Sequence, residues 1–284
     1  MTSFQHIIIT RFNLVYPGWK KDKHGNQLNS LEWLNHRFPL FERFCYPSVK
    51  GQSNQNFVWY VCFDETTPEH FRARIDNYRQ RFPNFTPLFT TSERWVHDIR
   101  LQISDSVDYL ISTRLDNDDA FHRDAIKVIQ TNFRKQQFEF LNILKGYVWY
   151  GERLDFLQET SNMFISLVER RRPAEPFTTI RGCGFHTKVH ELGPVCQIVT
   201  RGPHWLRIIH ERNVRRGKPT RRISYLSRAL HSIFPFNKFL IDKLYPGLCA
   251  RLNYRYVIHP VGAPIPMRKK TRLLLDDIKA DFSI

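Results

Sequence analysis

Hydrophobic residues along the chain gather in short continuous runs. HIIIT (6–10) and FVWYVCFD (57–64) are rich in β-branched and aromatic residues and end in polar ones, which predicts two buried strands. VDYLISTRLD (107–116) has the same character and predicts a third strand. Continuous rather than alternating apolar runs are typical of strands covered on both faces, as in a parallel sheet.

The segments between these runs repeat their apolar residues at helical spacing. Ser30 is a suitable N-cap for the first segment, in which Pro39 predicts a break or kink, and Pro68 falls in the first turn of the second. The predicted helices are SLEWLNHRFPLFERFCYPSV (30–49), TTPEHFRARIDNYRQRF (66–82), SERWVHDIRLQI (92–103) and DAFHRDAIKVIQTNFRKQQFEFL (119–141). Strands alternating with helices predict an α/β domain with a mostly parallel central sheet flanked by helices.

An acidic cluster directly follows the third predicted strand. TRLDNDDAF (113–121) contains Asp116, Asn117, Asp118 and Asp119 in a chain that is otherwise strongly basic. Their charges repel one another unless a cation lies among them. A solvated turn is the alternative, because Asp and Asn are common in turns, and Asp119 could simply cap the following helix.

Polar residues also end the other two predicted strands. Thr10, Arg11 and Asn13 follow the first strand, and Asp64 ends the second. In open α/β sheets, ligands bind beyond the carboxyl ends of the strands. Mg²⁺ and Mn²⁺ take carboxylate oxygens together with substrate phosphates, and a D-x-D pair can offer two carboxylates to one ion. We therefore expect a divalent metal at the acidic cluster, on Asp116, Asp118 and Asp119.

The spacing of residues excludes several other kinds of site. Where Ala120 and Phe121 stand, an EF-hand would need an oxygen ligand and then Gly, and a haloacid-dehalogenase motif would need Thr or Val at position 120. The chain has no GxxxxGK[ST] P-loop, no GxGxxG after the first strand and no HExxH. Nucleoside triphosphate hydrolysis, Rossmann-type dehydrogenation and zincin chemistry therefore have no support.

Charge and cysteine content narrow the class of partner. The 284 residues carry a formal net charge of +16, which favours nucleic acid, anionic lipid or a phosphate-bearing small molecule. Five scattered cysteines without a CxxC pair indicate a reducing compartment. The amino terminus lacks the apolar run of a secretory signal, and no stretch approaches the roughly 20 apolar residues that span a bilayer, so we expect a cytoplasmic protein.

Five blocks of the sequence, in order, resemble the putative rhamnosyltransferase family, a bacterial group within the GT-A-like glycosyltransferases. The blocks are HIIITRFN, RFPLF continuing to PSVKGQSNQNFVWYVCFD, LISTRLDNDDAFH, NMFISLVE (162–169) and HWLRIIHERNV (204–214). The resemblance implies a GT-A-like nucleotide-sugar-binding domain over residues 1–212. It also implies transfer of a sugar, rhamnose by the family label, from a nucleotide-diphosphate donor to a glycan or lipid-linked acceptor.

The strand-end residues have expected roles in such chemistry. Arg11 and Arg114 suit the donor phosphates by charge and fork geometry, although Arg114 could only pair with the nearby Asp116. A Mn²⁺ or Mg²⁺ ion on the acidic cluster would act as a Lewis acid on the departing diphosphate. The remaining nucleotide contacts are expected from Thr10, Asn13, Asp64 and Asp116.

Two further residues follow from the resemblance. It favours His210 as the residue that completes the metal shell, although a His beside an apolar run is more often a hydrogen-bonded structural residue. It also favours Glu169 as the base that deprotonates the acceptor hydroxyl in an inverting reaction. A salt bridge from Glu169 to the adjoining arginines is an equally good interpretation.

The character of the chain changes after residue 212. RNVRRGKPTRR (212–222) is strongly basic, and amphipathic stretches follow it. We expect residues 213–284 to form a basic helical C-terminal extension. This extension either packs on the core or makes peripheral contact with the anionic inner face of a membrane.

The alternative from another class is a nucleic-acid-binding protein or a metal-dependent nuclease. It rests on the net charge and on the 14% of aromatic residues, since single strands bind to basic grooves that carry stacking platforms. No RRM, KH, helix-turn-helix or zinc-finger pattern occurs in the sequence, and the acidic cluster would repel a phosphate backbone unless it held a metal. We therefore expect no specific nucleic-acid partner.

Overall fold

A computed structural model describes residues 3–14, 28–150, 153–210, 254–258 and 282–283 of the chain. The three apolar runs form strands β1, β2 and β4, as the sequence predicts. In chain order the elements are β1 (Phe4–Arg11), α1 (Leu31–Leu40), the π-helical turn η1 (Phe41–Cys45), α2 (Tyr46–Lys50), β2 (Val58–Asp64), α3 (Glu69–Arg81), β3 (Phe85–Thr90), α4 (Trp95–Arg100), β4 (Tyr109–Arg114), β5 (Ala120–Phe121), α5 (Ala125–Thr131), β6 (Phe138–Ile143), β7 (Lys145–Tyr150), β8 (Arg153–Gln158), β9 (Ser166–Arg170), the 3₁₀ turn η2 (His186–Lys188), α6 (Val189–Leu192), β10 (Val195–Val199), β11 (Trp205–Ile209) and β12 (Tyr254–Ile258).

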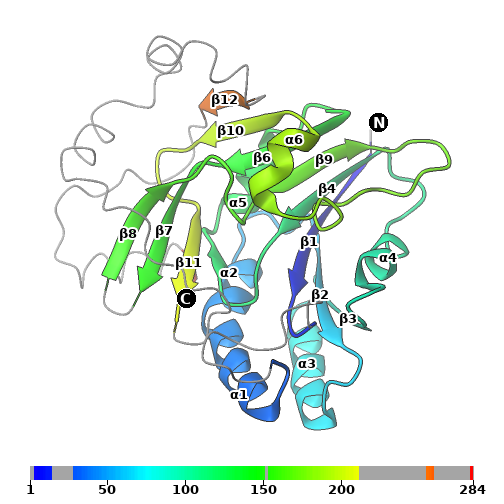
Figure 1. Ribbon diagram of the computed structural model, residues 1–284, viewed down its shortest axis with the longest axis vertical. Helices are drawn as coiled ribbons and strands as arrows, with labels where there is room; N and C mark the ends of the chain where they lie inside the picture. The colour runs from blue at the N-terminus through cyan, green and yellow to red at the C-terminus, as the bar shows by residue number, and fades with distance from the viewer. Residues whose placement is uncertain (1–2, 15–27, 151–152, 211–253, 259–281, 284) are drawn as a thin grey trace.

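Eight of these strands form the central sheet, in the order β12-β10-β6-β9-β4-β1-β2-β3 (Figure 1). Strand β9 is antiparallel to both of its neighbours, and the other pairs are parallel. The sheet is therefore mixed and mostly parallel, within an α/β fold. Because β1 lies between β2 and β4 and runs parallel to both, the carboxyl ends of the three strands meet at one edge.

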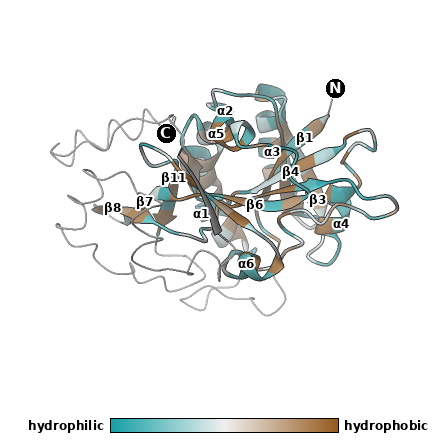
Figure 2. Cartoon of the chain, turned by 90° about the horizontal axis from the view of Figure 1, so that it is seen from above, coloured by the Kyte–Doolittle hydropathy of each residue, from teal (hydrophilic) through white to brown (hydrophobic). Residues whose placement is uncertain are grey.

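Both faces of the sheet are covered, which explains the continuous apolar runs. Within β1, Ile8 packs into a core that includes residues of α1, α3 and α5, while Ile7 and Ile9 pack into a second core with residues of α4 and α6. Figure 2 shows α2, α3 and α5 on one side of the sheet and α4 and α6 on the other. Successive strand residues point to opposite faces, so a strand buried on both sides needs apolar residues at every position.

A second sheet of four strands, in the order β5-β11-β7-β8, lies beside the first (Figure 1). Its strand β11 runs parallel to β7, and the other two pairs are antiparallel. Gly146 in β7 lies under the indole ring of Trp205 in β11, where an added Cβ would come within 1.9 Å of a ring atom. The strand β11 that packs here also supplies two residues, Arg207 and Ile208, to the lining of the cavity described below.

The first predicted helix is present but is not broken at Pro39. Ser30 is its N-cap and accepts a hydrogen bond from the Trp33 amide at 3.2 Å, as the sequence predicts. Pro39 lies inside α1, and the chain stays helical through η1 into α2. The π-helical turn that follows is a local irregularity of the kind that often accompanies a bend, and it does not end the helix.

The prediction of one helix over residues 119–141 is wrong in most of its length. Only Ala125–Thr131 is helical, and it is preceded by the short strand β5 and followed by β6. Residues 138–143 are buried in the middle of the central sheet between β9 and β10. Pairing on both sides and burial on both faces outweigh the helical spacing that the apolar residues of this segment also satisfy.

The described parts of residues 213–284 belong to the main body of the protein. Strand β12 pairs in parallel with β10 at the edge of the central sheet, and Phe282 is buried beside β5 and β11. The segment is therefore not a purely helical extension. The basic loop 212–222 and the amphipathic stretches after it lie outside the described residues. Among the described helices, none has the length and apolar character needed to cross a membrane.

Candidate functional site

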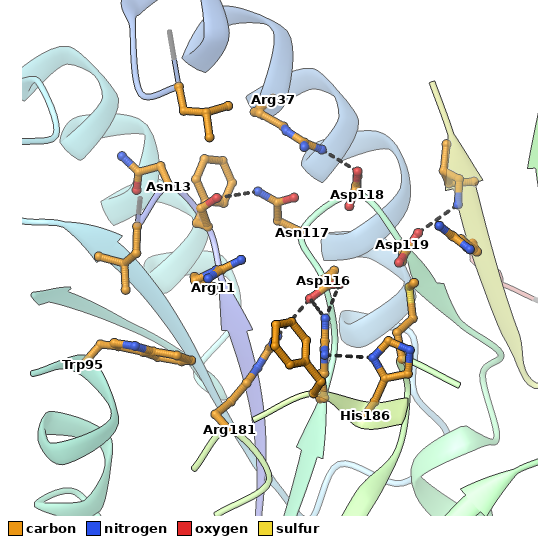
Figure 3. Close-up of a pocket in the computed structure, with 18 of the residues that line it drawn as sticks. Arg11, Asn13, Arg37, Trp95, Asp116, Asn117, Asp118, Asp119, Arg181 and His186 are labelled. Atoms are coloured by element: carbon orange, nitrogen blue, oxygen red, sulfur yellow. Dashed lines mark hydrogen bonds and ion pairs between the residues drawn. The ribbon is translucent and has the colours of Figure 1, made fainter. Parts of the chain in front are cut away.

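A cavity of about 430 Å³ opens at the carboxyl ends of β1 and β4. The ends of both strands line it, together with the acidic turn 116–119, residues of α1, the loop after β9, and β11. Its lining combines acidic, basic and aromatic side chains (Figure 3). This position, beyond the carboxyl ends of parallel strands, is where open α/β sheets bind ligands.

The acidic cluster is a turn that is tied to both neighbouring elements. The Asp119 amide bonds to the Asp116 carbonyl at 3.2 Å and closes the turn. The Asn117 side chain donates to the Phe12 carbonyl at 2.8 Å, which joins the turn to the end of β1. The turn interpretation and the site interpretation are thus compatible, because the turn presents its carboxylates to the cavity.

Asp116 is paired with two arginines. Its carboxylate accepts hydrogen bonds from Arg114 at 2.9 Å and from Arg181 at 3.1 Å. Burial alone would raise the pKa of Asp116, but Arg114 and Arg181, with a contribution from Arg11, hold it well below its usual range. Burial and the positive charge of Arg114 in turn lower the pKa of Arg181 to about 9. Asp116 is therefore ionised, and its charge stabilises two buried cations.

Asp118 is paired with a different arginine, from α1. The Arg37 guanidinium donates to Asp118 Oδ2, and His210 Nε2 lies 2.9 Å from the same oxygen. Burial opposes ionisation, but Arg37 and His210 outweigh it and lower the pKa of Asp118. The structure thus places His210 in a hydrogen-bonded pair with Asp118, and its role as a metal ligand stays a prediction.

Asp119 has a structural contact to β11. Its Oδ1 accepts the Ile208 amide at 2.8 Å. It does not cap the next helix, because α5 begins at Ala125 with Asp124 in the capping position. Burial, together with the negative charges of Asp118 and Asp116, raises the pKa of Asp119 well above its usual range. Of the three aspartates, Asp119 is the one whose charge is least supported by its surroundings.

Four of the residues predicted from the sequence, Thr10, Asp64, Glu169 and His210, are not part of the cavity lining. Thr10 is buried and accepts the Trp59 indole N–H at 2.9 Å, and Asp64 caps a turn by accepting the Thr66 amide at 2.9 Å. Glu169 lies opposite Leu110, near the amino end of β4, because β9 runs antiparallel to that strand. All four side chains are occupied in hydrogen bonds within the fold.

The placement of Glu169 does not agree with a role as the base. Its carboxylate accepts the backbone amides of Thr178 and Thr179, both at 2.8 Å. Burial raises its pKa, although the two amide bonds act in the opposite direction. Nor does it form the expected salt bridge to the adjoining arginines. Glu169 instead fixes the start of the loop that carries Arg181 to the site.

Several cavity residues were not singled out by sequence reasoning. Asn13 is a predicted residue that does line the cavity, and its side-chain amide donates to Asn29 at 2.6 Å. Those not predicted include Arg37, Trp95, Arg181, His186 and Arg207. His186 Nδ1 lies 3.3 Å from Arg114, and burial together with that arginine lowers the pKa of His186 to about 4. Two signals in the sequence could have indicated them. Arg37 begins RFPLF (37–41), which is one of the resembling blocks, and GCGF (182–185) marks an irregular loop next to Arg181.

The ligand types at the acidic turn suit a hard divalent cation, but their arrangement does not. Carboxylate oxygens and imidazole nitrogens are ligands that Mn²⁺ and Mg²⁺ accept. Here, however, Arg37, Arg114 and Arg181 occupy the carboxylates, and the described ranges contain no group of three or more His, Cys, Asp or Glu side chains arranged for a metal. A metal ion would require these ion pairs to open.

A family model described as “Putative rhamnosyl transferase” matches residues 5–222 of the chain. This range contains the whole cavity lining. The comparison with curated proteins finds no significant match.

Solved structures with similar folds are distant. A 4-diphosphocytidyl-2C-methyl-D-erythritol synthase from Anaerococcus prevotii has 10% identity and a TM-score of 0.35 and covers 76% of this chain and 94% of its own. A protein titled “putative nucleotide-diphospho-sugar transferase” from Desulfovibrio desulfuricans has 8% identity and a TM-score of 0.33, with 100% and 98% covered. A cytidylyltransferase from Leptospira borgpetersenii has 11% identity and a TM-score of 0.29, with 100% and 96% covered. At these TM-scores, no activity is transferred from them.

Proposed function

The chain belongs to the family described as “Putative rhamnosyl transferase”, and we propose on that premise that it transfers a sugar from a nucleotide-diphosphate donor to a hydroxyl group. Rhamnose is the sugar that the family description suggests. A glycan or a lipid-linked glycan is the acceptor class that fits this chemistry. The reaction breaks the bond between the sugar and the diphosphate and forms a new glycosidic bond, so negative charge develops on the departing diphosphate.

The cavity at the ends of β1 and β4 is the observation that carries this proposal. Its volume, about 430 Å³, lies in the range of roughly 300–1,000 Å³ typical of small-molecule sites. Arg11, Arg114 and Arg181 all line it and supply the positive charge that a diphosphate needs. Figure 3 shows Arg11 and Arg181 on the same side of the cavity as Asp116. Trp95 and Phe185 add aromatic surface for a base or a sugar ring.

The nucleic-acid alternative has weaker support. A strand of nucleic acid needs an extended basic groove with aromatic platforms. The basic and aromatic residues described here converge on one cavity that also contains three aspartates. Such a mixed and local arrangement suits a small phosphorylated ligand better.

Metal dependence remains a hypothesis within this proposal. Mn²⁺ or Mg²⁺ would bind Asp116 and Asp118, with His210 as a further ligand, once the ion pairs of these carboxylates with the arginines have opened. When bound, such an ion would neutralise charge on the leaving diphosphate. The test is the melting temperature with a nucleoside diphosphate in EDTA and in millimolar Mn²⁺. A larger stabilisation in Mn²⁺ supports the hypothesis, and equal melting temperatures count against it.

The transferase proposal itself is tested with a panel of nucleoside diphosphates and nucleotide sugars. Ligand-linked stabilisation identifies the donor, since a ligand at 100 times its Kd stabilises the folded state by about 2.7 kcal/mol. The stabilising nucleotide sugar is then incubated with glycan acceptors, and release of the nucleoside diphosphate is measured. Stabilisation by DNA alone, lost at moderate salt and with no response to any nucleotide sugar, would favour the nucleic-acid alternative.

A further inference from the structure

Two arginines that line the cavity share one carboxylate. Arg114 is the last residue of β4, and Arg181 lies in the loop after β9; both donate to Asp116. Arg11, at the end of β1, lies beside them and faces the same carboxylate (Figure 3). The three guanidinium groups come from separate elements, so their convergence is a property of the tertiary structure.

The hydrogen-bonding capacity of these arginines exceeds what the described protein groups supply. In the described part of the chain, the Nε atoms of Arg114 and Arg181 are buried and have no hydrogen-bond partner. The Arg181 side chain is 8% exposed, so it is more than nine-tenths buried. Buried donors without acceptors are costly and rare in folded proteins. A ligand with several acceptor oxygens would satisfy them.

The Arg181 guanidinium is held rigidly in place. It donates to the backbone carbonyls of Ile9 at 3.1 Å and Leu115 at 3.0 Å, at the ends of both strands. The loop that carries it is anchored by the Ile180 amide, which donates to the Ser112 hydroxyl at 2.7 Å. Groups held in position before binding lose little entropy when a ligand arrives.

Asp116 differs from the arginines because it is the accessible member of the group. Its side chain is 30% exposed, against 8% for Arg181 and 17% for Arg114. The carboxylate therefore lies between the cavity and the buried cations. A carboxylate and a phosphate present oxygen atoms to a guanidinium in similar geometry.

We propose that Arg114 and Arg181, with Arg11 beside them, form the binding site for the diphosphate of the donor, and that Asp116 occupies this site in the free protein as an internal stand-in that the ligand displaces. This inference rests on the proposed function for its choice of a diphosphate. It requires no metal for the binding step. It also predicts opposite changes in ligand affinity for substitutions of Arg181 and Asp116.

The test is calorimetric titration of the full chain with inorganic pyrophosphate and with a nucleoside diphosphate in EDTA. Arg181→Gln removes a cation of the site, and we expect at least tenfold weaker binding of both ligands. Asp116→Asn removes the internal competitor's charge, and we expect severalfold tighter binding. Arg172→Gln is the matched control, because Arg172 is exposed and outside the cavity; its affinity should equal that of the wild type.

Circular dichroism and urea unfolding on each variant separate loss of binding from loss of fold. Arg181→Lys is a second variant that keeps the charge but loses the fork, and it should bind with intermediate affinity. Unchanged pyrophosphate affinity in a folded Arg181→Gln protein overturns the proposal. So does weaker binding in a folded Asp116→Asn protein, or no binding of pyrophosphate by the wild type.

The outcomes also separate this inference from the transferase proposal. If pyrophosphate binds as expected but no nucleotide sugar is bound or transferred, the transferase proposal fails and the anion site stands. If a nucleotide sugar is transferred while Arg181→Gln leaves pyrophosphate binding unchanged, the anion site fails and the transferase proposal stands.

Discussion

Carboxylates lie at both ends of strand β4, and they are stabilised in different ways. At the carboxyl end, Asp116 and Asp118 are paired with the side chains of arginines. Near the amino end, Glu169 accepts two backbone amides. The pKa values follow this difference: the arginines lower the pKa of Asp116 and Asp118, whereas burial raises the pKa of Glu169.

The two arrangements differ in what they allow. A backbone amide cannot leave its acceptor without local unfolding, so the contacts of Glu169 are permanent parts of the fold. A guanidinium group that lines a cavity can exchange the oxygen of a carboxylate for an oxygen of a ligand without leaving its position. The carboxyl end of β4 therefore has exchangeable ion pairs and the amino end has fixed ones, and only the exchangeable end opens into the cavity.

The largest expected effect comes from breaking the ion pair of Asp118. Arg37→Met removes the guanidinium from a pair whose side chains are 7% and 11% exposed. Removing one partner of a buried ion pair costs about 3–5 kcal/mol of unfolding free energy, even though His210 stays beside Asp118. Urea unfolding at pH 7 measures this loss.

The pair of Arg74 and Glu42 is a matched control within the same protein. Arg74 also lies over an aromatic ring, that of Phe38, as Arg37 lies over Trp33, but both charged side chains of the control pair are 36% exposed. Arg74→Met should cost under about 1 kcal/mol, because solvent screens the pair. Equal losses in the two variants would show that burial does not distinguish the two pairs.

The second effect concerns His6, which lies in β1 beside the middle of β4 and has no charged partner among the described residues. It is buried, with Thr113 Oγ1 2.8 Å from Nε2 and Gln130 Nε2 3.0 Å from Nδ1. Burial lowers its pKa from 6.5 to about 3, so the unfolded chain binds a proton more readily than the folded one. The contribution of His6 to the unfolding free energy is therefore fully present above pH 6.5 and is lost as the pH falls from there toward 3.

Lowering the pH from 7 to 5 should cost about 2 kcal/mol through His6 alone. The measurement is the difference in unfolding free energy between the two pH values for the wild type and for His6→Gln, which does not titrate in this range. The variant should lose about 2 kcal/mol less than the wild type. An identical pH dependence in both proteins would mean that His6 does not become charged on unfolding.

Much of the sheet could be predicted from the sequence because its strands are buried on both faces. The runs 6–10, 57–64 and 107–116 leave few alternatives to a buried strand. Strand β3 received no prediction, since FTPLFT contains Pro87; the strand tolerates this proline because it lies at the edge of the sheet. Strand β6 was assigned to a helix because its apolar residues satisfy helical spacing as well.

The site was predictable where strand ends carry it and not where loops and helices do. Arg11, Arg114 and the acidic turn follow their strands directly, so the order of elements places them at one edge. Arg37 comes from a helix and Arg181 from a loop, and no local pattern states which strand end each will reach. Glu169 ends an apolar run as well, but its strand is antiparallel, and strand direction cannot be read from the run itself.

The smallest effect should come from the fixed end of β4. Glu169→Gln keeps one acceptor oxygen for the Thr178 and Thr179 amides and places an amide donor against the other. The lost hydrogen bond lowers the free energy of unfolding. Part of this loss is offset because burial disfavours the ionised carboxylate, which the substitution removes. We therefore expect a net cost of about 1 kcal/mol. The measurement is urea unfolding, with Glu175→Gln as the control, since Glu175 is exposed and should show no change.

Pyrophosphate titration of the Glu169→Gln variant adds a second readout. Because Glu169 anchors the loop of Arg181, its substitution should weaken binding about twofold to threefold, far less than Arg181→Gln. A loss as large as that of Arg181→Gln would show that the loop is not held by its other contacts, and the contrast between the two ends of β4 would then fail.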